Sequence, residues 1–449
     1  MKNFRLHLVI LALLVTVGSP AVRPTRGQTP TLKFDFGPGK VAHGYRQVIE
    51  TTTYTKERGY GFEPGASVSC VDRGGEDALR GDFCTSDKPY YFSVALPEGN
   101  YHVTVILGDA QGESTTTIKA ELRRLMLQGV HTARGEFATR TFTVNIRTSK
   151  IAGDGEVKLK DREKTTEVWA WDEKLTLEFN DRRPAVCALE ITRTNNLPTI
   201  YLLGDSTVCD QPREPYASWG QMLTGFFGPA VVIANNAESG ESLRSSLGAK
   251  RLDKVLSTMK PGDYLFIQFA HNDEKERGEG VGAFTTYKAD LKRFVAEARK
   301  LGGIPVLVTP MHRRTFDAQG KITNSHGDYP EAVRQTAKEE NVPLIDLNAM
   351  SKDLFEALGP QGTLKAFVHY PAGTFPDQPK ELKDDTHFNS YGAYELAKCI
   401  VEGVKAAKLG ITKYLVKDLW HFDPKHPDRP EDLKLLPSPL SAGVKPQSN

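Results

Sequence analysis

Beyond about residue 197, short apolar runs alternate with amphipathic helical patterns such as "YKADLKRFVAEARKLG" and "YPEAVRQTAKEENV". This alternation is typical of βαβ units, and it predicts a parallel sheet with helices on both faces. In such a sheet a site lies at the carboxyl ends of the strands. The residues that directly follow each strand are therefore the first candidates for function. The predicted strands are residues 200–203, 231–234, 264–269, 305–308 and 344–347.

The preceding part of the chain has a different pattern. Segments such as "TLKFDFG", "YYFSVALPEGNYHVTVILGD" and "KLTLEFND" alternate apolar and polar residues between Gly, Asn, Asp and Pro turns. They predict an antiparallel β-sandwich or jelly roll over residues 28–197. The pattern is similar to that of galactose-binding-like modules, which alone indicates no function. Trp169 and Trp171, two apart on one predicted strand face, favour core packing over a sugar-stacking platform.

Both ends of the chain differ from these two regions. Residues 1–27 combine a short basic region, an apolar stretch and small residues, which is typical of a secretory signal peptide. A start-transfer anchor is the alternative, although the apolar stretch is short for a membrane span. We therefore expect export to the periplasm or the cell exterior, with no membrane insertion after cleavage. After an α/β domain over residues 198–415, a Pro-rich tail, residues 416–449, either wraps that domain or trails from it.

Composition and cysteine content limit the function classes. With 39% apolar and 25% charged residues and a net charge of +2, the chain has an ordinary globular composition that gives no support for nucleic-acid binding. Cys70 and Cys84 bracket a loop and could form a disulfide, whereas Cys187 and Cys399 lie in apolar runs typical of a core. No Cys/His spacing indicates a zinc site, so no metal is predicted.

Four strand ends or loops carry polar residues suited to acyl transfer. They are "GDSTVCD" with Ser206, "NNAESGES" with Gly240, "IQFAHND" with Asn272, and "DDTHF" with Asp384 and His387 at the predicted start of the last helix. Singly, each motif can be explained as a turn, a helix entry, a strand terminator or a helix cap. Together they supply a nucleophile, oxyanion donors, a base and a carboxylate to orient it. One catalytic site therefore explains them better than four unrelated coincidences.

These motifs also resemble a known family. "GDST", "NNAESGES", "AHND" and "DDTH" are similar, in order, to the four sequence blocks of the SGNH (GDSL-type) hydrolases. The flanking segments "MKPGDYLFIQFAHND" and "VLVTPMHRRTF" resemble the sequences of rhamnogalacturonan acetylesterases. Over residues 199–409 the resemblance implies a flavodoxin-like three-layer α/β fold, no metal or other cofactor, and deacetylation of an acetylated plant cell-wall polysaccharide of the pectic class.

The resemblance also implies roles for individual residues. Asp385 is expected to be a capping or solvent residue. The implied catalytic roles are nucleophile for Ser206, general base for His387, orienting carboxylate for Asp384, and oxyanion donors for the Ser206 N–H, the Gly240 N–H and the Asn272 amide.

Two positions depart from the family pattern. Family members commonly have glycine at the position of Ala270, and an alanine fits there if its φ is negative. They commonly have a basic residue at the position of Glu241, so Glu241 is expected to remove a positive charge near the mouth of the site.

Substrate contacts are predicted for three residues near the sheet edge, His271, Arg313 and Arg314. The arginines could bind galacturonate carboxylates through paired hydrogen bonds, although surface salt bridges are the commoner use of such residues.

Other functions stay open at this point. An acetylxylan esterase or a lipid esterase of the same superfamily is one alternative, and the lipid esterase is disfavoured because no apolar lid segment is visible. A non-catalytic glycan-binding protein is another, and it would leave the catalytic set idle. The chain contains no G-x-S-x-G elbow, which argues against an α/β-hydrolase.

Overall fold

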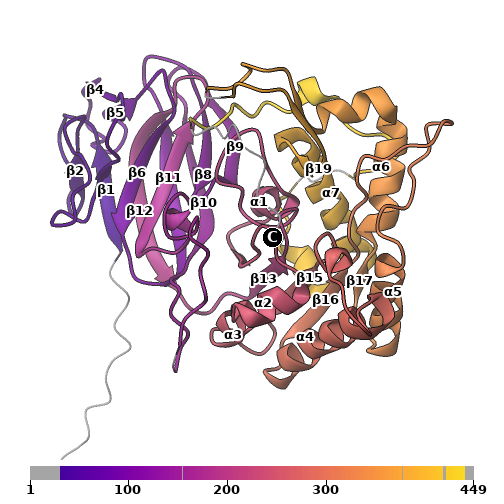
Figure 1. Cartoon of the computed structure of the whole chain (residues 1–449). Helices are drawn as coiled ribbons and strands as arrows, with labels where there is room; N and C mark the ends of the chain where they lie inside the picture. The colour runs from indigo at the N-terminus through magenta and orange to yellow at the C-terminus, as the bar shows by residue number, and fades with distance from the viewer. Residues whose placement is uncertain (1–30, 154, 377, 418–420, 440–449) are drawn as a thin grey trace, which may run out of the picture.

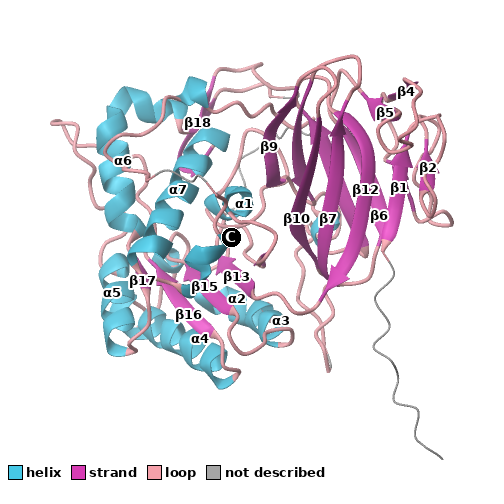
Figure 2. Ribbon diagram, turned by 180° about the vertical axis from the view of Figure 1, so that it is seen from behind, coloured by secondary structure: helices cyan, strands magenta, loops and turns pink. Residues whose placement is uncertain are grey.

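The computed structural model describes residues 31–153, 155–376, 378–417 and 421–439. The predicted signal peptide, residues 1–27, lies outside the described residues. The described chain forms two units that lie side by side (Figures 1 and 2): a sandwich unit, residues 32–194, and an α/β unit, residues 199–414. The domain boundaries predicted from the sequence stay predictions.

The sandwich unit consists of two facing β-sheets, which confirms the predicted β-sandwich. Strand pairing is antiparallel except between β1 and β2. Along β7 every second residue from Tyr101 to Leu107 is buried between the sheets, as the period-two pattern requires. The seven-stranded sheet contains β10 (Phe137–Ile146), β7 (Gly99–Gly108), β12 (Ala185–Thr194), β1 (Leu32–Phe36), β2 (Arg46–Val48), β4 (Ser69–Asp72) and β5 (Asp82–Thr85), and the five-stranded sheet contains β3 (Tyr60–Phe62), β6 (Tyr90–Ala95), β11 (Lys174–Asn180), β8 (Ser114–Ala120) and β9 (Arg124–Thr132).

Two local features of the sandwich unit concern predicted residues. Cys70 and Cys84 face each other across β4 and β5 and form a disulfide. The predicted strand around Trp169 and Trp171 is wrong, because residues 168–170 form the short 3-10 helix η1 (Val168–Ala170) among the turns that precede β11. Trp171 is buried, with the Arg147 guanidinium 4.5 Å from its ring centroid, so it packs in the interior rather than offering a stacking surface.

The α/β unit is built on five parallel strands in the order β14-β13-β15-β16-β17, which is the flavodoxin-like order. Alternate residues of β13 face opposite layers. Ile200 and Leu202 pack against α1, α6 and α7, whereas Tyr201 and Leu203 pack against α3, α4 and α5. The predicted three-layer fold is therefore confirmed. The strands are β13 (Thr199–Gly204), β14 (Val232–Asn235), β15 (Tyr264–Gln268), β16 (Ile304–Val308) and β17 (Leu344–Ile345).

The helices of this unit cover both faces of the sheet (Figure 2). They are α1 (Trp219–Leu223), α2 (Leu243–Gly248), α3 (Arg251–Leu256), α4 (Lys288–Lys300), α5 (Tyr329–Glu339), α6 (Leu347–Gly362) and α7 (Ser390–Ala406). Shorter turns of the unit are η2 (Thr224–Phe226), η3 (Asp273–Lys275), η4 (Ala283–Tyr287), η5 (Thr363–Lys365) and η6 (Gly410–Tyr414), and η7 (Pro430–Asp432) lies in the tail. No described helix has both the length and the apolar character needed to cross a membrane.

The "DDTHF" segment is a strand, so the prediction that it opens the last helix is wrong. It belongs to β19 (Leu382–Phe388), which pairs antiparallel with β18 (Phe367–Tyr370). Its exposure alternates from Leu382 to Asp385, which is the period of a strand rather than a helix. Helix α7 begins only after Asn389, whose side chain accepts a hydrogen bond from the Gly392 N–H and acts as the N-cap.

The two units and the tail are joined by buried contacts. Leu125 of the sandwich unit packs in the core of the α/β unit, and the buried Arg123 pairs with Glu214. The tail returns over this junction, where the Ser438 N–H donates to Glu214 (2.9 Å) and Lys119 donates to the Ser438 hydroxyl (2.7 Å). The described part of the tail therefore packs against the α/β unit, which is the first of the two predicted alternatives, and does not trail from it. It also ties both units together.

Candidate active site

Ser206 lies on a tight turn directly after β13. A side chain at Gly204 would put a Cβ 2.5 Å from the Val208 side chain and 2.6 Å from the Gln268 carbonyl oxygen, so only glycine fits there. The Asp205 carbonyl accepts hydrogen bonds from the Val208 and Cys209 N–H groups, both at 3.0 Å, and closes the turn. Among the described residues, the Ser206 N–H finds no hydrogen-bond acceptor, which leaves it available to a ligand.

The neighbouring Asp205 is buried, and its side chain stabilises this turn. One of its carboxylate oxygens accepts from the Thr207 N–H (2.9 Å) and hydroxyl (2.7 Å), and the other lies 3.3 Å from His271 Nδ1. Burial favours a raised pKa, but His271 and Thr207 hold the pKa of Asp205 below its ordinary value. Burial also lowers the pKa of His271 to about 4. His271 is only 2% exposed, and its predicted contact with substrate stays a prediction.

Ser206, His387 and Asp384 form one hydrogen-bonded chain. His387 Nε2 lies 2.8 Å from Ser206 Oγ, and His387 Nδ1 lies 2.8 Å from Asp384 Oδ2. The other oxygen of Asp384 accepts from the backbone N–H groups of Thr386 (2.9 Å) and His387 (3.1 Å). All three side chains are buried. This arrangement can activate a serine hydroxyl by moving its proton to an imidazole that a carboxylate holds in place.

The adjacent carboxylate, Asp385, has a different environment. It is exposed, and it pairs with Arg314 (3.1 Å) and His369 (2.9 Å) on the surface of the unit. The structure therefore brings Asp384, and not Asp385, to the imidazole of His387.

Two further donors come from the next two strand ends. Gly240, in the 236–242 loop after β14, has φ +78°, which favours glycine, and its N–H finds no acceptor among the described residues. Asn272, after β15, donates one amide hydrogen to the Glu241 carbonyl (3.0 Å) and accepts from Lys275 (2.8 Å). These contacts fix the amide plane and leave its second hydrogen for another acceptor.

Gln211 links the first two strand ends. Its side-chain amide donates to the Ser206 carbonyl at 2.7 Å and lies 3.4 Å from the Ser239 hydroxyl. The serine turn and the 236–242 loop are therefore direct neighbours. No local pattern in the sequence indicates this role of Gln211, since it depends on a contact between separate strand ends.

Ala270 does not have the negative φ that the sequence comparison required of an alanine. Its φ is +140°, and its side chain is fully buried after the end of β15. The Ala270 carbonyl accepts from the Glu274 N–H (3.1 Å) as the chain turns into η3, with Asn272 inside the turn. The alanine therefore carries backbone strain of about 1–3 kcal/mol that a glycine would not have.

Ala270→Gly is expected to leave the free energy of unfolding within about 1 kcal/mol of its original value, because relief of strain offsets the lost methyl burial and the greater freedom of the unfolded chain. The matched variant Ala298→Gly, at a buried site inside α4, is expected to lower it by about 2 kcal/mol. Urea unfolding of both variants tests this difference. Equal losses would show that Ala270 is unstrained.

The Glu241 carboxylate is not free at the mouth of the site, as the family comparison implied, but lies in a buried group of ion pairs. Glu241 is 1% exposed, and its carboxylate pairs with Lys160 (3.0 Å) and Arg251 (3.5 Å). Lys160 belongs to the sandwich unit, which the comparison of sequence blocks could not take into account. The negative charge is thus compensated inside the protein.

The two predicted substrate-binding arginines both form ion pairs with carboxylates of this chain. Arg313 pairs with Glu274, which also contacts His326 at 2.8 Å. Arg314 pairs with Asp385 and donates to the Pro360 carbonyl (2.8 Å). Their contact with substrate stays a prediction. In the part of the chain that the structure describes, no three His, Cys, Asp or Glu side chains gather as a metal site would require.

Comparisons with known proteins match both units. Residues 202–393 match the GDSL-like lipase/acylhydrolase family, and residues 32–152 match the galactose-binding domain-like family of beta-agarase/YXIM esterase-like proteins. Rhamnogalacturonan acetylesterase RhgT of Bacillus subtilis is 40% identical over 219 residues, which cover 48% of this chain and 94% of RhgT. The uncharacterized esterase YxiM of the same organism is 27% identical over 423 residues, which cover 90% of this chain and 98% of YxiM. The crystal structure of YxiM aligns with 85% of this chain and 99% of its own, at 25% identity and a TM-score of 0.44.

Proposed function

Because the chain belongs to the GDSL-like lipase/acylhydrolase family and is a carbohydrate acetylesterase, we propose that it removes acetyl groups from a pectic polysaccharide of the rhamnogalacturonan class. The observation that carries the chemistry is the hydrogen-bonded chain from Ser206 through His387 to Asp384, at 2.8 Å for each step. The similarity to RhgT over most of that protein's length supports the substrate class.

In the acylation half of the proposed reaction, Ser206 Oγ attacks the acetyl carbonyl carbon while His387 Nε2 accepts the hydroxyl proton. The carbonyl oxygen becomes an oxyanion, which the N–H groups of Ser206 and Gly240 and the amide of Asn272 stabilise. Each such donor contributes about 100- to 1,000-fold to the rate in comparable sites. Collapse of the tetrahedral intermediate breaks the bond to the sugar oxygen, which leaves with the proton from His387. Ser206 then carries the acetyl group.

The deacylation half repeats this sequence with water. His387 accepts a proton from a water molecule as its oxygen attacks the acetyl carbon, and the same donors stabilise the second oxyanion. The bond to Ser206 Oγ breaks, His387 returns the proton to that oxygen, and acetate leaves. Asp384 keeps the His387 Nδ1 proton in place, so that Nε2 always faces the reacting oxygen.

We further propose that the enzyme acts outside the cytoplasm, since its substrate is a cell-wall polymer and residues 1–27 have the pattern of a signal peptide. The disulfide between Cys70 and Cys84 supports an oxidising compartment.

The substrate class can be tested by acetate release. Purified enzyme is incubated with acetylated rhamnogalacturonan, acetylated xylan and a long-chain aryl ester, and kcat/KM is measured for each. We expect the highest kcat/KM for acetylated rhamnogalacturonan. A higher value for acetylated xylan would contradict the pectic substrate but keep the acetylesterase, and a higher value for the long-chain ester would contradict both.

A further inference from the structure

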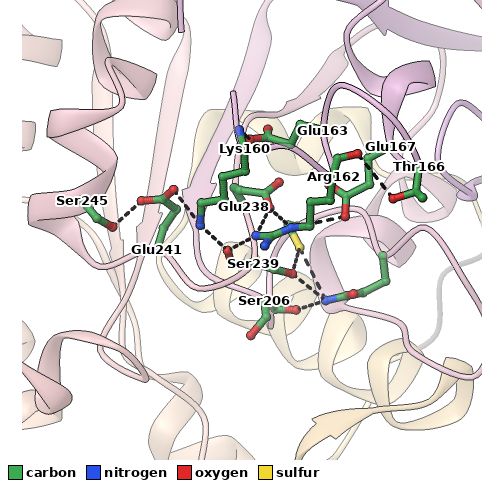
Figure 3. A network of polar contacts seen from close by, with 12 residues as sticks. Lys160, Arg162, Glu163, Thr166, Glu167, Ser206, Glu238, Ser239, Glu241 and Ser245 are labelled. Carbon is green, nitrogen blue, oxygen red and sulfur yellow. Dashed lines mark hydrogen bonds and ion pairs between the residues drawn. The ribbon is translucent and has the colours of Figure 1, made fainter. Parts of the chain in front are cut away.

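A segment of the sandwich unit, residues 158–167, reaches into the α/β unit beside the candidate oxyanion site (Figure 3). Its first residue, Lys158, donates its backbone N–H to the Ala249 carbonyl after α2 (3.0 Å). The buried Glu163 anchors its middle, accepting from the Lys160 backbone N–H (2.8 Å), Trp171 Nε1 (2.9 Å) and Arg251 (2.6 Å). These contacts hold the segment at a fixed position relative to the 236–242 loop.

Two cationic side chains of this segment, Lys160 and Arg162, contact the loop on either side of Gly240. Lys160 Nζ donates to the Ser239 carbonyl (2.7 Å) and pairs with Glu241 (3.0 Å). Arg162 also donates to the Ser239 carbonyl, and its Nε donates to Glu238 (2.9 Å). Their side chains are only 18% and 21% exposed, so solvent screens these interactions incompletely.

The Ser239 carbonyl matters because it shares one peptide unit with the Gly240 N–H. A trans peptide is planar, and its C=O and N–H groups point in opposite directions. Two cationic donors on the carbonyl side therefore fix the direction of the Gly240 N–H on the other side. They also polarise the peptide, which makes that N–H a stronger donor.

The loop that carries this N–H is a direct neighbour of the serine turn. Ser206 lies next to the loop, joined to it through Gln211, which contacts both the Ser206 carbonyl and the Ser239 hydroxyl. The Gly240 N–H, without an acceptor of its own among the described residues, is left to an oxygen bound at Ser206.

We propose that Lys160 and Arg162 are positioning residues for the hydrolysis, which orient and polarise the Ser239–Gly240 peptide so that the sandwich unit completes the oxyanion hole of the α/β unit. This role rests on the proposed function, and it assigns the sandwich unit a part in the rate of the reaction, separate from any binding of sugar.

The test uses the full chain with the variants Lys160→Met, Arg162→Met and Arg162→Lys. The matched control is Lys164→Met, since Lys164 lies in the same segment, is exposed and, within the described part of the chain, pairs only with Asp161 at 3.6 Å. For each variant, kcat and KM are measured with 4-nitrophenyl acetate, and the inhibition constant is measured for phenylboronic acid, whose serine adduct places an oxygen in the oxyanion hole. Thermal unfolding reports whether each variant is folded.

Each methionine variant is expected to lower kcat about 10- to 100-fold, less than the loss of a whole oxyanion donor, with KM nearly unchanged. The inhibition constant of phenylboronic acid should rise by the same factor as kcat/KM falls. Arg162→Lys, which keeps the charge beside Glu238 and one donor to the Ser239 carbonyl, should recover most of the rate, and Lys164→Met should match the original enzyme.

Two different failures can be told apart. Unchanged kcat and unchanged inhibition in folded Lys160→Met and Arg162→Met, or a change in KM alone, would overturn the positioning role while leaving the hydrolase intact. If the Ser206→Ala variant hydrolyses 4-nitrophenyl acetate as fast as the original enzyme does, the proposed function itself fails. If the methionine variants do not fold, Lys160→Gln and Arg162→Gln take their place: a kcat loss matched by weaker phenylboronic acid binding supports the role, and unchanged values contradict it.

Discussion

Asp384→Asn is expected to lower kcat about 10,000-fold with little change in KM, the size of effect seen when a triad aspartate becomes an asparagine. The asparagine side chain has the same shape, and its oxygen can still accept the N–H groups of Thr386 and His387. Its amide nitrogen, however, would face His387 Nδ1 and donate to it. The imidazole would then carry its proton on Nε2, where it could no longer accept the proton of Ser206.

The neighbouring carboxylate provides the matched control. Asp385→Asn changes an exposed side chain that pairs with Arg314 and His369, so we expect less than a tenfold change in kcat. Steady-state kinetics with 4-nitrophenyl acetate measure both variants. A large loss in Asp385→Asn together with near-normal turnover in Asp384→Asn would exchange the two roles.

Ser206→Ala should have the largest effect of any single substitution, a loss in kcat on the order of 1,000,000-fold. The variant removes the atom that becomes acetylated, while the free N–H groups of residues 206 and 240 and the Asn272 amide remain. Substrate binding should therefore persist, and KM should change little. Isothermal titration with an acetylated rhamnogalacturonan oligosaccharide can check that binding in the inactive variant.

Ser257→Ala controls for loss of a serine hydroxyl elsewhere. That hydroxyl donates to the Lys254 carbonyl (2.8 Å) at the end of α3, so the variant should keep normal turnover. Comparable turnover in Ser206→Ala and the original enzyme would refute the assignment of the nucleophile.

The sequence predicted the α/β fold, and with it the positions of the strand-end residues, because both follow from local patterns. Five apolar runs with helical patterns between them determine a parallel sheet, and the carboxyl ends of its strands meet at one edge. Ser206, Gly240 and Asn272 each lie in the loop that follows such a strand. Their convergence needed only the strand order, not the details of packing.

Other features depend on contacts that no local pattern carries. The "DDTHF" segment has residues suited to a helix cap, but pairing with β18 makes it a strand. The positive φ of Ala270 arises from the turn into η3, and Glu241 is buried because Lys160 and Arg251 compensate its charge. Lys160 and Arg162 stand in turns of the other unit, so nothing near them in the sequence indicated the active site.

The sequence patterns divide the chain into two units, but buried contacts join these units in the structure. The buried Leu125, the pair of Arg123 with Glu214, and the tail at Ser438 all join the sandwich unit to the α/β unit. The contacts of Lys160 with the 236–242 loop are part of the same interface between the units. We therefore expect changes in the sandwich unit to affect turnover as well as stability.

Detection of the acetyl-enzyme tests the central claim most directly. The enzyme is mixed with excess 4-nitrophenyl acetate, quenched with acid during turnover, digested and analysed by mass spectrometry. The account predicts one acetyl group on the peptide that contains Ser206, absent from Ser206→Ala and accumulating when deacylation is slower than acylation. Turnover by the enzyme with the acetyl group on a different residue, or the same acetylated peptide from an enzyme denatured beforehand, would contradict it.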